Sequence, residues 1–156
     1  MSNKFLITKA SLKDVSQIYK LINFYAKKNL MLERSLNQIY ENLRDFWICK
    51  NKDTLLGCCA LHIVGWRNLG EIRSLAVKPR FKKRGIGSRL VEMCLQEAKQ
   101  LQLDEVFVLT FVPNFFEKLG FRRIKKEKLP HKIWSECINC PLFPDKCKEV
   151  ALIKKL

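Results

Sequence analysis

The stretch Glu71-Ile72-Arg73-Ser74-Leu75-Ala76-Val77-Lys78-Pro79, followed by Lys82-Lys83-Arg84-Gly85-Ile86-Gly87-Ser88, decides how this chain folds. The first segment predicts a strand that ends at Pro79, because proline has no backbone N–H to continue a ladder. The second segment leads into an amphipathic helix at about residues 85–101. The apolar face of this helix is predicted to carry Leu90, Val91, Cys94, Leu95 and Ala98.

The loop between this strand and helix has the composition of an anion site. A helix N-terminus offers unpaired backbone N–H groups and a partial positive charge, and glycines let the backbone approach a phosphate closely. Lys82, Lys83 and Arg84 supply cations beside it. A tight structural turn also explains many Gly-x-Gly loops. The loop does not match the dinucleotide fingerprint, since Leu90 stands where the third glycine belongs, and it has no Walker Gly-Lys-Ser/Thr sequence.

Outward from this stretch, the pattern predicts one α/β domain over residues 1–156, with a mixed central β-sheet and about four helices. Ser11 and Ser35 are expected to cap the first two helices, and Asp14 gives the first cap the spacing of a capping box. Two further helices are predicted at 85–101 and 114–119. Strands are predicted at residues 5–8, 46–49, 55–64, 71–77, 105–111, 121–124 and 150–153.

Composition limits the classes of function. With 47% hydrophobic residues the 156-residue chain is expected to build a core, and no apolar run approaches a membrane span. The N-terminus lacks a signal peptide pattern, so a cytoplasmic protein is expected. The net charge of +15 favours anionic partners, although a general enrichment in lysine explains it equally well. A basic nucleic-acid-binding module is an alternative, but basic and aromatic residues are not interleaved. We therefore expect neither nucleic acid nor membrane as a partner.

Together with Gly120-Phe121, which follows Phe115-Phe116-Glu117-Lys118-Leu119, the two quoted stretches resemble the GNAT acetyltransferase superfamily. The resemblance implies that acetyl-CoA is the co-substrate and that the glycine loop binds its pyrophosphate, with Lys82 in place of the usual Arg or Gln. It also implies a bulge in the strand, whose N–H groups bind the pantetheine arm and polarise the thioester. The cofactor-binding residues implied are Leu75, Ala76, Val77, Lys82, Lys83, Arg84, Gly85, Ile86, Gly87, Ser88 and Phe116.

The segments Leu32-Glu33-Arg34-Ser35, Leu129-Pro130-His131-Lys132-Ile133-Trp134 and Cys137-Ile138-Asn139-Cys140-Pro141 resemble the short bacterial N-acetylglutamate synthases. This narrower resemblance implies acetyl transfer to the α-amine of L-glutamate, the first step of arginine biosynthesis. Acetylation of another amine and a non-catalytic acetyl-CoA-binding domain remain the alternatives. The sequence leaves open the exact acceptor, a homodimer and feedback regulation.

By the same resemblance, Glu71 is the candidate general base, acting through water; a strand-start carboxylate paired with a surface cation is the other interpretation. Glutamate carries two carboxylates, for which Arg34 and Arg73 are the candidate ligands, although Arg34 also fits a solvated position before a helix. Family members often have a Tyr that gives a proton to the departing thiolate at the position where this chain has Phe116. Close relatives frequently have a Tyr at Phe111, so no general acid is assigned.

The seven cysteines fall into two groups. Cys49, Cys58, Cys59 and Cys94 lie in apolar stretches and are predicted to be small buried hydrophobes. Cys137-x2-Cys140-x6-Cys147, with His131 upstream, lies in a C-terminal loop at about 129–148 and has the ligand types of a structural zinc site. Free thiols or a redox pair are the alternatives for that loop.

Overall fold

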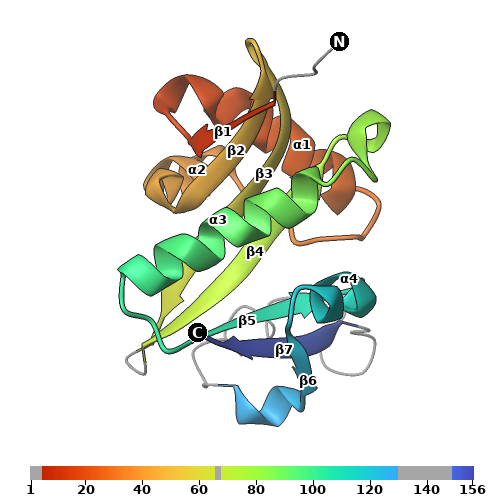
Figure 1. The fold of residues 1–156 in the computed structure, drawn as a ribbon. Helices are drawn as coiled ribbons and strands as arrows, with labels where there is room; N and C mark the ends of the chain where they lie inside the picture. Colours follow the sequence, from red (N-terminus) through yellow and green to blue (C-terminus); the bar gives the residue numbers. More distant parts are fainter. Residues whose placement is uncertain (1–4, 66–67, 130–148) are drawn as a thin grey trace. The chain divides into compact units, whose positions relative to one another are not determined.

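The computed structural model describes residues 5–65, 68–129 and 149–156 (Figure 1). It contains a seven-stranded sheet in the order β1-β2-β3-β4-β5-β7-β6. Strand β4 runs parallel to β5, whereas β1–β2, β2–β3, β5–β7 and β6–β7 are antiparallel. The predicted mixed α/β sheet is confirmed. The strands are β1 (Leu6–Lys9), β2 (Phe46–Asn51), β3 (Thr54–Val64), β4 (Leu69–Val77), β5 (Glu105–Thr110), β6 (Arg122–Ile124) and β7 (Val150–Lys155).

Four α-helices lie in the described part of the chain: α1 (Val15–Ala26), α2 (Leu36–Glu41), α3 (Ile86–Gln100) and α4 (Pro113–Lys118). Along the chain the order is β1-α1-α2-β2-β3-β4-α3-β5-α4-β6-β7, which agrees with the predicted order. The residues group into two compact units. The first contains the described residues of 1–61 and 73–96, and the second those of 62–72 and 97–156.

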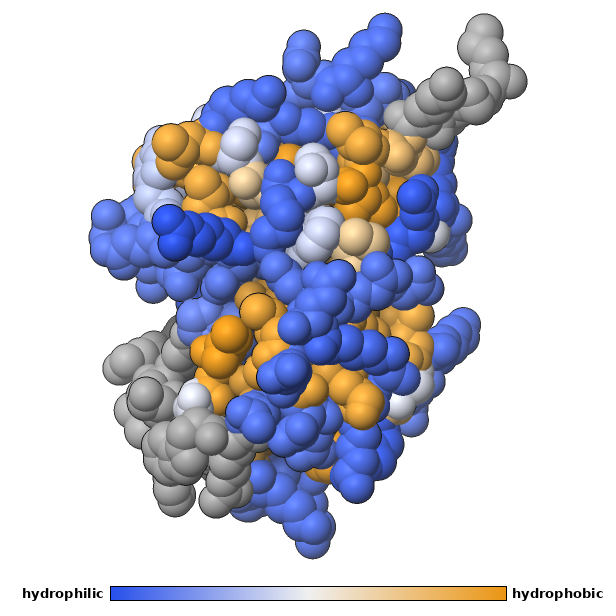
Figure 2. All heavy atoms as spheres, turned by 60° about the vertical axis from the view of Figure 1, so that its left-hand side comes forward, coloured by the Kyte–Doolittle hydropathy of each residue, from blue (hydrophilic) through white to orange (hydrophobic). Residues whose placement is uncertain are grey.

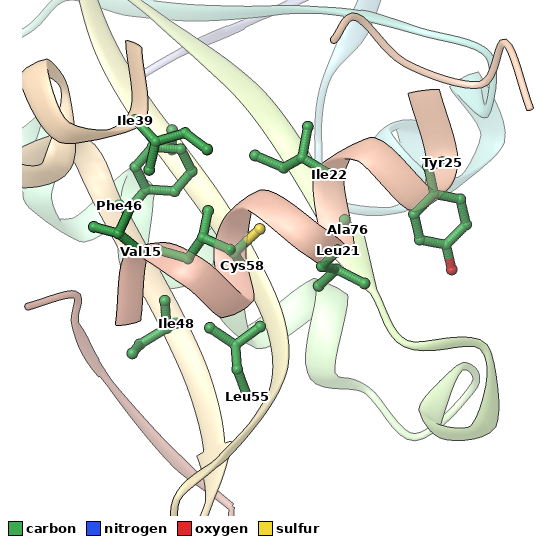
Figure 3. Packing of buried hydrophobic residues seen from close by; sticks show 12 residues of the cluster. Val15, Leu21, Ile22, Tyr25, Ile39, Phe46, Ile48, Leu55, Cys58 and Ala76 are labelled. Carbon is green, nitrogen blue, oxygen red and sulfur yellow. The ribbon is translucent and has the colours of Figure 1, made fainter. Parts of the chain in front are cut away.

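The core of the first unit lies between α1, α2 and strands β2, β3 and β4 (Figure 3). Helix α1 turns Ile18, Leu21 and Ile22 inward, and each is at most 5% exposed. Burial of one such side chain contributes about 1.5–3 kcal/mol, so this stripe is a main source of the unit's stability. Tyr25, one turn beyond Leu21, is buried on the same face.

Side chains fix where the first two helical segments begin. Ser11 and Asp14 form a capping box at a short 3-10 turn (Leu12–Asp14) that runs into α1. Ser35 caps α2: its hydroxyl accepts from the Gln38 N–H at 3.1 Å, and its own N–H donates to Gln38 Oε1 at 2.8 Å. Each box satisfies backbone groups that a helix leaves unpaired at its start. Both predicted caps are confirmed.

Asp14 is also half of a buried ion pair. It is 2% exposed, pairs with Lys50 of β2, and accepts from the Ser11 N–H at 2.8 Å. Burial alone would raise the pKa of the Asp14 carboxyl, but the hydrogen bonds from Lys50 and Ser11 outweigh it and hold the pKa below its ordinary value. The pair therefore stabilises the folded state above the unfolded pKa of about 3.9, and that contribution is lost as pH falls through the folded pKa.

We expect Asp14→Asn to lower the free energy of unfolding at neutral pH by about 3 kcal/mol, because it leaves the Lys50 ammonium buried without its counter-charge. The difference from wild type should shrink in acid, where the wild-type carboxylate is protonated too. Urea unfolding over a pH series measures this. Asp53→Asn, at an exposed turn position, is the matched control; an equal loss in both variants would contradict the assignment.

The second unit is built on the β5–β7 ladder, which runs from Glu105 opposite Lys155 to Thr110 opposite Val150. Its core contains Val64, Leu69, Phe107, Leu129, Ala151 and Ile153. Helix α4 starts at Pro113 and is followed by Gly120, whose φ of 93° ends the helix in the left-handed conformation. Strand β7 comes last in the chain, but in the sheet it lies between β5 and β6.

All four cysteines that the structure describes are buried and free, as predicted. Burial raises the pKa of the Cys49 thiol and raises that of Cys58 to about 12. No group of three or more His, Cys, Asp or Glu in residues 5–65, 68–129 and 149–156 is placed to hold a metal. The predicted zinc ligands Cys137, Cys140, Cys147 and His131 lie outside the described residues, so that hypothesis stays a prediction.

Hydrophilic residues cover most of the face shown in Figure 2, with separate apolar patches among them. Within the described ranges, no helix has both the length and the apolar character needed to cross a bilayer.

Candidate active site

Strand β4 is distorted at Ser74. This residue has a φ of 57°, in the left-handed region that a non-glycine residue seldom adopts. The thiol of Cys58 on β3 donates to the Ser74 carbonyl at 3.3 Å. This conformation disturbs the regular pleat between Arg73 and Leu75, within the strand for which the resemblance implies a bulge.

Beyond Ser74, the peptide groups of β4 divide between two sides. The Ala76 carbonyl oxygen lies toward β3, because a Cβ added to Gly57 would be 3.1 Å from it, and the Lys78 N–H donates to Leu56 O at 2.8 Å. Alternate residues of a strand point their N–H and C=O to opposite sides. The N–H groups of Leu75 and Val77 therefore point away from β3.

The loop after β4 combines backbone turns with positive charge. A short 3-10 turn (Pro79–Phe81) leads to Lys83 and Gly85, which have φ values of 65° and 80°, and α3 begins at Ile86. Positive φ on either side of Arg84 turns the backbone tightly in front of the helix N-terminus, a shape that gathers N–H groups toward an anion. The side chains of Lys82, Lys83 and Arg84 are exposed. The predicted basic loop between β4 and α3 is present, whereas its binding of a pyrophosphate stays a prediction.

Two polar residues of α1 support this site and were not predicted. Asn23 is 9% exposed and its amide nitrogen donates to Tyr19 O at 2.9 Å and to Arg34 O at 3.2 Å. Tyr25 is 7% exposed and its hydroxyl donates to Val77 O. The signal that could have found them is a polar group at core spacing on an otherwise apolar helix face.

The two candidate substrate arginines lie in the first unit. Arg34 is half-buried; its carbonyl is held by Asn23, and the next residue is the N-cap of α2, so its backbone is fixed on both sides. Arg73 is half-buried and directly precedes the distortion at Ser74. Neither is a freely solvated surface residue.

Glu71 and Phe116 lie in the second unit. Glu71 is 8% exposed and stands third in β4, opposite Phe107 in the parallel ladder with β5. It is therefore not an exposed strand-start carboxylate. Phe116 is 2% exposed and packs edge-on against Phe115 and Phe121, with ring centroids 4.9 and 5.4 Å apart. Its ring carries no proton to donate to a leaving thiolate.

Strand β4, with its left-handed Ser74 and its amides directed away from β3, leads into a cationic turn before α3. Such an arrangement suits a ligand that carries phosphates. Residues 12–121 match the model of the Acetyltransferase (GNAT) family. The chain belongs to this family, and the protein is an acetyl-CoA-dependent N-acetyltransferase.

Two curated relatives match most of this chain. The chain is 41% identical over 150 residues to an uncharacterized N-acetyltransferase of Chlorobaculum tepidum, covering 96% of each protein. It is 39% identical over 134 residues to an amino-acid acetyltransferase of Mycobacterium tuberculosis, covering 84% of this chain and 76% of that one.

Solved structures share the fold. One is a Mycobacterium tuberculosis protein in complex with CoA and a second ligand, with a TM-score of 0.83 and 32% identity over 97% of this chain and 99% of that one. Another is N-acetylglutamate synthase from Neisseria gonorrhoeae, complexed with coenzyme A and N-acetyl-glutamate. It has a TM-score of 0.89 and 24% identity, and the match covers 100% of this chain and 36% of that one. At this identity the likeness shows the fold alone.

Proposed function

We propose that this enzyme transfers the acetyl group of acetyl-CoA to the α-amine of L-glutamate, giving N-acetylglutamate for arginine biosynthesis. The observation that carries the proposal is the sequence of groups along β4. A buried carboxylate (Glu71), a half-buried guanidinium (Arg73) and two outward-directed amides (Leu75 and Val77) follow one another on a single strand. The resemblance to amino-acid acetyltransferases supports the choice of an amino acid as acceptor.

The donor half of the site consists of the loop and the end of β4. The loop N–H groups and the exposed cations Lys82, Lys83 and Arg84 bind the pyrophosphate of coenzyme A, with Gly85, Ile86, Gly87 and Ser88 forming the start of the helix behind it. Of the three predicted strand amides, we assign pantetheine and thioester contacts to Leu75 and Val77. Ala76 faces β3 and has a supporting role. Phe116 packs against Phe121 in the second unit, and we assign it no part in proton transfer.

The acceptor half supplies a base and two cations. Glutamate's ammonium must lose a proton before its nitrogen can attack the thioester carbonyl, and Glu71 takes this proton through a water molecule. The negative charge that develops on the thioester oxygen is stabilised by the strand N–H groups. The C–S bond then breaks, the second proton of the former ammonium passes to the departing thiolate, and Glu71 returns the first proton to solvent. Arg34 and Arg73 pair with the two carboxylates of glutamate.

The test is a thiol-release assay with acetyl-CoA and each amino acid in turn, glutamine included. Glutamine has nearly the shape of glutamate but lacks the second carboxylate, so a site with two arginines should prefer glutamate by about tenfold or more in kcat/KM. Mass spectrometry of the product locates the acetyl group on the α-nitrogen. A clear preference for a different amine would overturn the glutamate assignment and leave the acetyltransferase class intact.

A further inference from the structure

Tyr25 closes the C-terminal end of α1 against the donor half of the site. Its ring belongs to the core cluster of the first unit and is 7% exposed. Its hydroxyl donates to the backbone carbonyl of Val77 at 2.5 Å. In Figure 3 this hydroxyl points away from the other labelled core side chains. A phenylalanine would fill the same space, so the hydroxyl has a purpose apart from packing.

The Val77 carbonyl lies on the side of β4 that faces away from β3. The N–H and C=O of one strand residue point to the same side, and for Val77 that side is away from β3. On this side, the carbonyl accepts from Tyr25, and the N–H is the group that we assign to the pantetheine arm. The hydrogen bond from Tyr25 therefore fixes the orientation of a peptide group that the donor must contact.

The ring of Tyr25 also contacts the loop before α3. The Lys82 ammonium lies 4.9 Å from the centroid of the Tyr25 ring. A cation over an aromatic face is attracted by the ring's negative charge density, so the ring limits where this flexible, exposed side chain rests. One side chain thus contacts both the strand that meets the thioester arm and the first cation of the pyrophosphate loop.

We propose that Tyr25 is a positioning residue that couples the thioester end of the donor site to its pyrophosphate end, an inference that rests on the proposed acetyl-CoA site but not on the identity of the acceptor. The hydroxyl orients the Val77 peptide, and the ring places the Lys82 ammonium. The two contacts are chemically separate, so two substitutions divide them. Tyr25→Phe removes only the first, and Tyr25→Leu removes both.

Two acetyl donors distinguish the contacts. Acetyl-CoA uses both ends of the site, whereas S-acetyl-N-acetylcysteamine has the thioester and part of the arm but no pyrophosphate. Tyr25→Phe should lower kcat/KM by about fivefold to tenfold with both donors, since both need the Val77 amide. Tyr25→Leu should lose about a further threefold with acetyl-CoA and nothing more with the short thioester.

The matched control is Tyr19→Phe, which removes a hydroxyl from the same helix six residues earlier, where the ring is only partly buried. Melting temperatures of all variants report any loss of folding. Direct titration of CoA by calorimetry gives affinity without any acceptor. Tyr25→Phe should weaken CoA by the same factor as it lowers kcat/KM, with a melting temperature close to that of wild type.

The outcomes separate the two proposals. If wild-type protein binds CoA, and Tyr25→Phe matches it in CoA affinity and with both donors, the positioning role is overturned. The same holds if Tyr19→Phe loses as much as Tyr25→Phe, or if the Tyr25→Phe loss merely follows its melting temperature. If the wild-type protein does not bind CoA, the donor site itself is wrong and the inference falls with it. A different preferred acceptor leaves the role of Tyr25 unchanged.

Discussion

Replacing Glu71 by Gln should lower turnover of the saturated enzyme by about two to four orders of magnitude. Gln has almost the same shape, so the buried position in β4 stays filled, but its amide cannot take the proton that the acceptor amine must lose. CoA affinity should be unchanged. The defect should also shrink as pH rises, because a growing fraction of the bound acceptor then already carries a deprotonated amine. A pH profile of kcat for both proteins measures this.

Glu105→Gln is the control for that experiment. Glu105 lies at the start of the same parallel ladder, opposite Leu69, and has no assigned role in the reaction. It should leave turnover and its pH profile as in wild type. If Glu71→Gln keeps wild-type turnover, or if its defect is the same at every pH, Glu71 is not the base.

Arg34→Gln and Arg73→Gln should each raise the KM for glutamate by about tenfold to a hundredfold, the value of a charged hydrogen bond. The KM for acetyl-CoA should change little. Comparing glutamate with glutamine then assigns the two carboxylates. The variant that has lost the side-chain carboxylate contact no longer distinguishes these acceptors, whereas the variant that has lost the α-carboxylate contact is impaired with both.

The control here is Arg122→Gln, which removes one exposed positive charge from β6. It corrects for any general attraction of anionic substrates by the net charge of +15. If Arg122→Gln raises the KM for glutamate as strongly as the other two variants do, the specific contacts are contradicted.

The sequence predicted well whatever depends on neighbours in the chain. The apolar spacing of α3 is a local property, and so are the caps at Ser11 and Ser35 and the loop before α3; all of these match the structure. The predicted bulge in β4 rested on a resemblance, because nothing local requires a left-handed serine at position 74.

Contacts between distant segments were beyond the sequence. The insertion of β7 between β5 and β6 depends on which strand edges meet, which chain order does not specify. Tyr25 and Val77 are separated by 52 residues, so their hydrogen bond has no signature in either segment alone. For the same reason the pattern could not show which strand amides face β3: the Ala76 carbonyl lies beside Gly57, a residue on another strand. The roles of Glu71, Arg34 and Arg73 depend on such distances and remain proposals.

The burial of Cys49, Cys58, Cys59 and Cys94 has a practical consequence for the kinetics. Thiol dyes react with thiolates, and all four of these thiols are buried. Burial also raises the pKa of Cys49, Cys58 and Cys59, so few of these thiols are ionised. They should therefore consume dye slowly at the mildly alkaline pH of a colorimetric reading. A blank of enzyme alone subtracts the dye that the protein itself consumes. The colour that develops during turnover then reports the coenzyme set free, and progress curves can be followed continuously.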